Sequence, residues 1–398
     1  MTTTALEYPS VKLKPKEEGR LLNGHLWAFS NEIAEPPDGV EPGALADLYH
    51  AGKGFIGRGF YHPNSLIAFR LLTYQKDDVI DESFFEKRFR EALSLRERAY
   101  PGCSAHRWIF GESDRLPGLV VDRFGDYLSV QILSAGMERL KDVILAALAK
   151  AVPARGIVWR PDAAIRSLEG LSEDAPSAAL GDIPERLAIE LENGRFEVDL
   201  LGGQKTGFYF DQRDNRQALA ALCRGRKVLD AFCYSGGFGI AAARAGAREV
   251  VFSDSSRAAL ELAEDNWGQN NLDVLSTFVE GDAAKLLEHE SPGGPFDVVC
   301  VDPPAFARTK KQLPAALKAY EKLNSLAIGA LPRGGIVATS SCSHHLDRET
   351  FVEMLRRASR KARRPVRLLE LRGQAKDHPV LLAMPETEYL KFALLQVM

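Results

Sequence analysis

Cysteine is scarce in this chain, and its few cysteines are not spaced for a metal site or a disulfide framework. The 398 residues include five cysteines, at positions 103, 223, 233, 300 and 342, and none of them forms a CxxC pair. An odd number of scattered cysteines argues against paired disulfides and against a zinc knuckle. The sequence therefore predicts a protein of the reducing cytoplasm that binds no metal.

Long apolar runs are also missing. No stretch reaches the roughly 18 apolar residues that a membrane-spanning helix needs, and the N-terminal segment MTTTALEYPSVKLKPKEEG has no apolar core of a secretory signal. Neither sign of charge dominates, because 51 basic residues face 54 acidic ones. These absences exclude a membrane protein and a disordered chain, and the length favours two or three globular domains.

Basic residues are nevertheless concentrated toward the C-terminus. Residues 201–398 hold 27 Lys and Arg against 23 Asp and Glu, and they include a dense run formed by Arg356, Arg357, Arg360, Lys361, Arg363, Arg364 and Arg367. Such a run is often only the solvated face of a helix. It is also typical of a surface that contacts nucleic-acid phosphates, in which case we expect it partly near the substrate edge.

The chain divides by pattern into three regions. Residues 1–75 hold short apolar runs between Gly and Pro signals, which predicts a small β-barrel or sandwich. Residues 76–200 mix strand-like stretches with two helical patterns, the first capped by Asp81, and they predict a compact α+β domain. Residues 201–398 form the third domain.

Apolar strands and helices alternate in this third domain. The expected strands cover residues 228–231, 249–253, 276–280, 296–301 and 335–340. This alternation predicts an α/β domain with a doubly wound, parallel sheet. Ligands of such sheets bind at the carboxyl ends of the strands, so residues that follow those ends are candidates for the site.

Three aspartates follow successive strands at this edge. Asp230 begins the turn DAFCYSGGFG, with Ser235, Gly236 and Gly237 in its glycine-rich part, and Asp254 and Asp282 follow the next two strands. Each aspartate alone has helix capping as an equally good explanation. Together they suggest that Asp230 attracts a cationic group, Asp254 holds a ribose diol and Asp282 binds an adenine amino group.

The ligand of this edge is a nucleoside without a pyrophosphate. The strict GxGxxG fingerprint of dinucleotide sites is absent. Several carboxylates would also repel the phosphates of a dinucleotide. S-adenosylmethionine has an adenine, a ribose diol and a sulfonium cation but no phosphate, and it is therefore the predicted cofactor.

Two further strand ends carry candidate catalytic groups. The fourth strand ends in Asp302-Pro303-Pro304, where prolines stop the strand and place an acid for a planar base. The fifth ends in SSCSHH, where Cys342 lies past the apolar run and suits a nucleophile. Pro303, Pro304 and Ser343 are the expected contacts to the substrate. The other cysteines of this domain, Cys223, Cys233 and Cys300, are expected to be structural, and His344 and His345 lack a third metal ligand.

The chain resembles the bacterial RNA 5-methylcytosine methyltransferases that act on large-subunit ribosomal RNA. Members of this family have an N-terminal PUA domain, a central α+β domain and a class I methyltransferase domain, and the resemblance covers nearly the whole chain. It is carried here by GHLWAFS (24–30), DRLPGLVVD (114–122), QKTGFYFDQR (204–213), DAFCYSGGFG (230–239), VDPPAF (301–306) and SSCS (340–343).

The resemblance implies roles for residues that the strand pattern leaves unassigned. The QKTGFYFDQR segment would cover one side of the cofactor, with contacts from Lys205, Thr206, Phe208, Asp211 and Gln212. Cys342 would be the nucleophile and Asp302 the acid that contacts the base. Many RNA members of the wider cytosine group carry a second cysteine after the fourth strand, where this chain has Ala305. A mechanism with two cysteines is therefore doubtful, and uracil stays open as the target.

The expected activity is methylation of C5 of a cytosine in RNA through a covalent Cys342–C6 adduct, with large-subunit ribosomal RNA as the partner and a homodimer as one possible state. Formation of 5-methyluridine, methylation of an amino group of guanine or adenine, and RNA binding without catalysis are the alternatives. In the amino-group case, Asp302 and its prolines would serve and Cys342 would be incidental.

Overall fold

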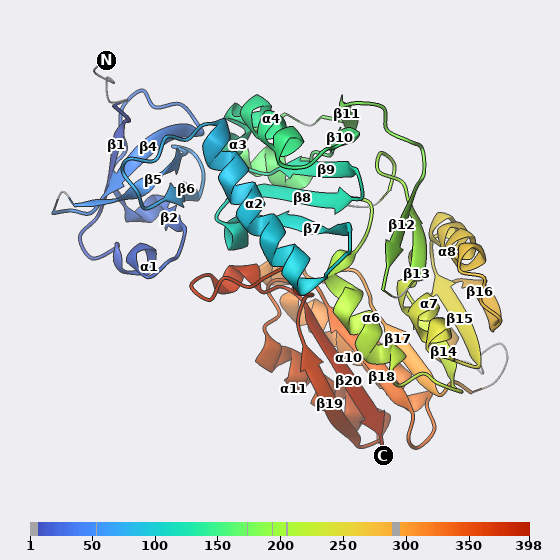
Figure 1. Ribbon diagram of the computed structural model, residues 1–398. Helices are drawn as coiled ribbons and strands as arrows, with labels where there is room; N and C mark the ends of the chain where they lie inside the picture. Colours follow the sequence, from blue (N-terminus) through green and yellow to red (C-terminus); the bar gives the residue numbers. More distant parts are fainter. Residues whose placement is uncertain (1–6, 53, 173, 193, 204–205, 289–294) are drawn as a thin grey trace. The chain divides into compact units, whose positions relative to one another are not determined.

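The computed structural model describes residues 7–398 except 53, 173, 193, 204–205 and 289–294. The described chain splits into two compact units, each with its own sheets (Figure 1). The first unit contains residues 1–187, 198–208 and 377–387, and the second contains residues 188–197, 209–376 and 388–398. No helix of the described residues is both long enough and apolar enough to cross a bilayer.

The first unit begins with a six-stranded sheet in the order β2-β6-β5-β4-β1-β3. It packs around buried side chains such as Val11, Leu26 and Phe69. The expected small barrel-like domain is confirmed, because the short strands alternate with the predicted Gly and Pro turns. Its elements are β1 (Ser10–Leu13), α1 (Gly19–Leu22), β2 (Trp27–Phe29), β3 (Ile33–Glu35), β4 (Ala44–Tyr49), β5 (Phe55–Tyr61) and β6 (Ile67–Thr73).

A five-stranded sheet in the order β11-β10-β9-β8-β7 forms the rest of this unit. Helix α2 (Glu82–Ala99) packs on it through Phe85 and Phe89, and Asp81 caps the helix by accepting a hydrogen bond from the Phe84 nitrogen at 3.0 Å. The cap that the sequence predicts is thus confirmed. The other elements are β7 (Ala105–Phe110), β8 (Leu119–Phe124), β9 (Tyr127–Ile132), α3 (Ala135–Arg139), α4 (Lys141–Ala151), β10 (Gly156–Trp159), α5 (Ala163–Arg166) and β11 (Ser177–Leu180).

The second unit is built on a seven-stranded sheet in the order β16-β15-β14-β17-β18-β20-β19. The first five strands in this order pair in parallel, and β20 joins them antiparallel. This is the predicted doubly wound sheet. Its strands are β14 (Lys227–Ala231), β15 (Glu249–Asp254), β16 (Leu275–Glu280), β17 (Val298–Val301), β18 (Ile336–Ser341), β19 (Val366–Arg372) and β20 (Lys391–Val397).

Helices connect these strands and bury a large apolar core on the sheet. Val299, Tyr320 and Phe351 are among its fully buried members and come from a strand and two helices. The helices are α6 (Arg213–Ala220), α7 (Gly237–Arg244), α8 (Arg257–Gln269), α9 (Ala283–Glu288), α10 (Leu313–Gly329) and α11 (Arg348–Ala362). Because each parallel strand is followed by a helix that returns along the sheet, all strand-to-helix loops gather at one edge.

The hairpin β12 (Leu187–Leu191) and β13 (Gly194–Val198) differs from the sequence-based division at residue 200. Most of it belongs to the second unit. The reason is hydrogen bonding to side chains at the end of α8. The Glu197 nitrogen donates to Oδ1 of Asn266 at 2.6 Å, and the Arg195 nitrogen donates to Oδ1 of Asn270, the residue that follows the helix, at 2.9 Å. Residues 377–387 return to the first unit, which a division into consecutive ranges does not provide for.

Candidate active site at the carboxyl edge of the parallel sheet

The three aspartates of the predicted cofactor site follow neighbouring strands of the second unit. Asp230 is the second-last residue of β14, and Asp254 ends β15. Asp282 follows β16 and directly precedes α9. The registers Ala231↔Ser253 and Asp254↔Glu280 align these strand ends at one edge. The geometry thus brings together the residues that the sequence placed there.

The glycine-rich turn after β14 has an unusual backbone. Phe232 and Tyr234 have φ of 63° and 47°, and Gly236 has φ of 78°. Left-handed φ is uncommon outside glycine and often marks a functional turn. A Cβ on Gly237 would come within 2.6 Å of Nε of Arg216, so a side chain there would disturb a buried arginine. Glycine at position 237 therefore lets the turn pack closely against Arg216.

Asp230 stabilises this turn through a hydrogen bond to its backbone. Its side chain is 1 % exposed, and Oδ2 accepts a hydrogen bond from the Gly239 nitrogen at 2.8 Å. Burial raises the pKa of Asp230 to about 7, and the nearby charges of Asp302 and Asp254 act in the same direction. The Gly239 nitrogen and the buried Arg216 lower this pKa in part. Asp230 therefore holds the loop in place, and its charge is available only where a cation compensates it.

Replacing Asp230 by asparagine is expected to change the pH dependence of stability. Because the folded pKa lies above the ordinary value of 3.8, the folded state binds more protons than the unfolded state between these values, and wild-type stability falls as pH rises toward 7. The Asp230→Asn variant lacks this loss, so relative to wild type it should gain up to about 4 kcal/mol between pH 4 and pH 8.

The measurement is urea unfolding of the second unit, read by pulsed hydrogen exchange of peptides from β14 and β17. Exposed Asp273 serves as the matched control, and Asp273→Asn should leave the curve parallel to that of wild type. Parallel curves for Asp230→Asn would contradict the raised pKa.

Asp254 and Asp282 also hold backbone. Asp254 accepts hydrogen bonds from the nitrogens of Tyr234 at 3.1 Å and Ser256 at 2.9 Å, and Asp282 accepts from those of Ala284 at 2.8 Å and Lys285 at 3.1 Å. The capping interpretation is therefore correct for Asp282, whereas Ser256 and not Asp254 caps α8. Neither set of contacts excludes a ligand, because a carboxylate has about four acceptor sites. Ser235 is buried, and its carbonyl accepts from Asn266.

This donor set fits S-adenosylmethionine. Carboxylates follow three successive strands, the glycine turn leaves room for a close approach, and the charges suit a cation and hydroxyl groups rather than phosphates. Asp254 would hold the ribose, Asp282 the adenine edge, and the turn at Ser235, Gly236 and Gly237 the amino-acid part.

Asp302 follows β17 at the same edge. Its Oδ1 accepts hydrogen bonds from the Ser340 hydroxyl and from Nε2 of Gln212 at 3.0 Å. Burial raises its pKa, and the charge of Asp211 adds to this effect. Both of these hydrogen bonds use Oδ1. Among the described residues, Oδ2 is therefore available to bind a ligand. Pro303 is buried and Pro304 is exposed, so only the second proline presents its ring to solvent.

Cys342 lies in the loop that follows β18 and is half-buried. The other three cysteines of this unit are buried, as expected, and burial raises the pKa of the Cys223 thiol to about 12. Ser343 is turned inward, because its hydroxyl lies 3.1 Å from the Tyr320 hydroxyl and accepts from the Ala307 nitrogen. It therefore supports the cysteine loop, whereas the sequence suggested a substrate contact.

Several site residues are outside the residues that the sequence singled out. Burial raises the pKa of Tyr209, and the charges of Tyr234, Asp211, Asp302 and Cys342 all act on its hydroxyl. Tyr209 therefore lies where the acid and the nucleophile converge. Tyr209 belongs to the QKTGFYFDQR segment, which the family resemblance assigns to the cofactor site. The sequence alone does not tell which aromatic ring of this segment points to the site.

Arg216 and Tyr389 complete the surroundings of the acids. Arg216 is 4 % exposed, and the charges of Asp211, Asp302 and Asp230 oppose the effect of burial on its pKa. The Tyr389 hydroxyl donates to Oδ2 of Asp211 at 2.6 Å. The buried Arg216 thus offsets part of the charge of several acids. Asp211 and Gln212 are themselves nearly fully buried, so they organise the edge from within.

Residues 206–208 of the QKTGFYFDQR segment belong to the first unit. Thr206 is fully buried and donates its hydroxyl hydrogen bond to Oδ2 of Asp122, which also pairs with Arg107. Phe208 is 2 % exposed. Their assignment as cofactor contacts stays a prediction, and Lys205 lies outside the described residues.

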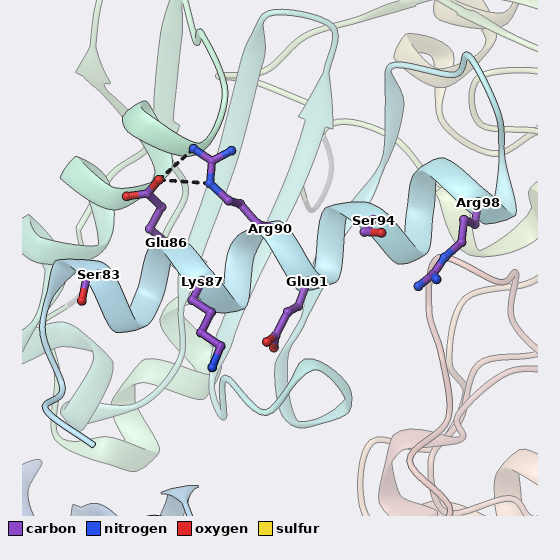
Figure 2. Close-up of a pocket in the computed structure, with 7 residues that line it drawn as sticks. All are labelled: Ser83, Glu86, Lys87, Arg90, Glu91, Ser94 and Arg98. Carbon is purple, nitrogen blue, oxygen red and sulfur yellow. Dashed lines mark hydrogen bonds and ion pairs between the residues drawn. The ribbon is translucent and has the colours of Figure 1, made fainter. Parts of the chain in front are cut away.

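A shallow hollow on the first unit carries none of the predicted chemistry. Seven side chains of α2 line it: Ser83, Glu86, Lys87, Arg90, Glu91, Ser94 and Arg98 (Figure 2). Both signs of charge occur, and Glu86 accepts two hydrogen bonds from Arg90. It has the properties of a solvated helix face. Among the described residues, no three potential ligands are grouped for a metal ion.

Comparison with known proteins agrees with this architecture. Residues 11–74 match a family model described as a PUA-like domain, and residues 157–345 match one described as an S-adenosylmethionine-dependent methyltransferase. A solved structure of a SAM-dependent methyltransferase from Streptococcus mutans superposes with a TM-score of 0.82 at 21% identity and covers 98% of this chain and 100% of that chain. A further solved methyltransferase, complexed with SAH, has a TM-score of 0.83. At this identity the two structures support the fold.

Curated relatives extend the match over the whole chain. The protein named ribosomal RNA large subunit methyltransferase I from Aeromonas hydrophila is 40% identical over 388 residues, which is 96% of this chain and 98% of the relative. The protein of the same name from Photobacterium profundum is 41% identical over 389 residues. Because the identity is this high over nearly the full length, the chain belongs to the family of S-adenosylmethionine-dependent methyltransferases represented by ribosomal RNA large subunit methyltransferase I.

Proposed function

We propose that this protein methylates C5 of a cytosine in large-subunit ribosomal RNA. The observation that carries the proposal is the place of Cys342, half-buried in the loop after β18, beside the strand end that holds Asp302. Ser340, two residues before the cysteine, donates to Asp302. The names of the relatives support ribosomal RNA as the substrate.

The proposed reaction begins with Cys342. Its thiol loses a proton to solvent, and the thiolate adds to C6 of the pyrimidine, so that an S–C6 bond forms and C5 becomes nucleophilic. S-adenosylmethionine, when bound, would supply the methyl group to C5, and the electron pair of the broken S–CH3 bond would stay on its sulfur, which becomes a neutral thioether. Loss of the C5 proton to a base and breaking of the S–C6 bond then restore the aromatic ring and free Cys342. The target base must leave its stack to reach the sulfur.

Asp302 would act on the opposite edge of the base. Burial keeps its carboxyl neutral over a wider pH range than usual, because it raises the pKa. A neutral carboxyl at Oδ2 donates a hydrogen bond to N3 of cytosine, whereas an ionised one accepts from the N4 amino group. The neutral state stabilises the negative charge that spreads over the ring when sulfur adds to C6, because it donates to N3. The ionised state would only orient the base through its amino group.

Nucleoside analysis tests the proposal. Purified protein is incubated with isotopically labelled S-adenosylmethionine and either naked large-subunit RNA or assembled large subunits, and the RNA is digested and examined by mass spectrometry. Labelled 5-methylcytidine is the expected product. Labelled 5-methyluridine would move the target to uracil, which the single-cysteine layout also suits. A methylated amino group would replace the mechanism, and transfer of no methyl group to either RNA would favour the non-catalytic alternative.

The basic run is not where the sequence suggested. Helix α11 begins beside the cysteine loop but runs back along the sheet for 15 residues, or about 22 Å. Near its far end, Arg364 donates to the carbonyl of Leu331, before β18 starts. The expectation that the run lies partly near the substrate edge is therefore wrong. Three exposed arginines there, Arg356, Arg357 and Arg360, share one partner, Glu353.

This unequal pairing leaves a positive surface, and neutralising its three arginines should weaken RNA binding. If each contacts one phosphate, the triple Arg→Gln variant should reduce the slope of log affinity against log salt by about 2 to 3. Binding of a ribosomal RNA fragment is measured by fluorescence anisotropy at several salt concentrations.

Glu353→Gln is the matched control, because it frees the same arginines and should raise RNA affinity. S-adenosylmethionine affinity should not change in either variant. An unchanged salt slope in the triple variant would return these arginines to the role of a solvated helix face.

A further inference from the structure

Lys391 is a buried lysine beside the cysteine loop, and the proposed reaction leaves it without a role. It is 2 % exposed and begins β20, directly opposite Ser341 in the antiparallel pair of β18 and β20. Buried lysines are rare unless they are paired. Its strand partner, Ser341, directly precedes Cys342, so Lys391 lies next to the start of the cysteine loop.

The ammonium group holds the loop on both sides. Nζ donates to the carbonyl of Ser343 at 2.7 Å and to the carbonyl of Tyr389 at 2.7 Å. Ser343 directly follows Cys342, and the Tyr389 ring stacks on His344 at 5.4 Å. Two neutral carbonyls satisfy two of the three N–H groups but cannot compensate the charge of an ammonium.

The carboxylates near Lys391 have other partners. Glu388 pairs with Arg348 at 2.7 Å, and Asp347 accepts from the Thr350 nitrogen as the cap of α11. Burial lowers the pKa of Lys391 to about 8, and among the charges that oppose this effect the one on Cys342 is the largest. Other titratable groups that interact with Cys342 or Lys391 include Tyr209, Tyr320, Glu388, Asp347 and Arg348.

We propose that Lys391 is a positioning residue that keeps Cys342 as a thiolate and fixes the loop that carries it. The inference rests on the proposed function only for its purpose, since the charge of Lys391 and its hydrogen bonds to the carbonyls of Ser343 and Tyr389 need neither RNA nor cofactor. A cation beside a cysteine favours the thiolate, which is the attacking species. When sulfur adds to C6, its negative charge moves into the pyrimidine ring, and Lys391 keeps its proton throughout.

The test is the pH profile of Cys342 alkylation in the full-length protein. Iodoacetamide is applied between pH 6 and pH 10, and labelled peptides are quantified by mass spectrometry, with half-buried Cys103 as the internal reference. In wild type, the Cys342 midpoint should lie at least about one unit below the ordinary thiol value of about 8.5. In Lys391→Gln, which keeps hydrogen-bond donors but no charge, the midpoint should rise, and alkylation at pH 7 should slow about tenfold.

Two further variants separate charge from packing. Lys391→Arg retains the cation and should keep the midpoint near that of wild type, and exposed Lys322→Gln should change nothing. A wild-type midpoint at or above about 8.5 would overturn the inference, and so would an unchanged midpoint in Lys391→Gln. If Lys391→Gln does not fold, the wild-type midpoint decides.

The outcome is independent of the proposed function. A lowered midpoint without methyl transfer to RNA would support the role of Lys391 and contradict the proposed reaction. Methylation at C5 with an ordinary midpoint would support the reaction and contradict the role of Lys391.

Discussion

Replacing Cys342 by alanine is expected to abolish methyl transfer to RNA, with residual activity below about 10⁻⁴ of wild type. C5 of a neutral pyrimidine is too weak a nucleophile to accept a methyl group unaided, so the adduct at C6 cannot be omitted. The side chain is small and half-buried, so the variant should bind RNA and S-adenosylmethionine with nearly unchanged affinity. Transfer of a labelled methyl group and calorimetry of cofactor binding check both parts.

A trapping experiment makes this prediction specific to C5. In RNA with 5-fluorocytidine at the target, fluorine cannot leave as a proton does, so the wild-type protein should remain covalently attached in a denaturing gel. The Cys342→Ala variant should form no such adduct. Cys233→Ala and Cys300→Ala are matched controls at buried cysteines and should retain activity, apart from a modest packing loss at Cys300. Robust methylation by Cys342→Ala would instead favour an amino-group mechanism.

Replacing Asp302 by asparagine should slow methylation by about 10² to 10³, as for the loss of a group that stabilises charge in the transition state. The amide oxygen at the Oδ1 position can still accept from Ser340 and Gln212, so the loop should keep its shape. At the Oδ2 position, however, an NH₂ group can neither accept from the cytosine amino group nor transfer a proton to N3. Single-turnover rates at saturating RNA measure the effect.

The size of this effect separates the roles of Asp302 and Cys342. Adduct formation with 5-fluorocytidine should be slowed in Asp302→Asn but not eliminated, because the sulfur remains. RNA affinity should change little, and Asp273→Asn is the control for removal of an exposed charge from the same unit. A wild-type rate in Asp302→Asn would show that this carboxyl takes no part in the reaction and that its role is structural.

The sequence by itself determined the architecture of this protein and the edge at which its chemistry lies. Alternation of apolar strands with helices predicts a parallel sheet, and right-handed connections place all strand ends on one side, so Asp230, Asp254, Asp302 and Cys342 are drawn together without knowledge of any contact. The short motifs of the chain added the family. Burial of Cys300 followed from the apolar run around it.

Only the tertiary structure decided which groups surround the reactive atoms. Lys391 reaches the cysteine loop from β20, and Tyr389 lies just before this strand. Because β20 is far along the chain and pairs antiparallel with β18, no local pattern predicts their place. Arg216 is likewise an ordinary helical arginine in the sequence and a buried cation among acids in the fold. The inward turn of Ser343 depends on Tyr320 from α10.

The same distinction explains two further differences between sequence and structure. The basic run was placed by its position after the fifth strand, but a helix of 15 residues carries its far end along the whole sheet. The hairpin β12–β13 joined the second unit through asparagine side chains at the end of α8 that accept main-chain hydrogen bonds. Periodicity in the sequence indicates which face of a helix or strand is apolar. Contacts between residues that are distant in the chain depend on packing and on hydrogen bonds, and these form only in the folded chain.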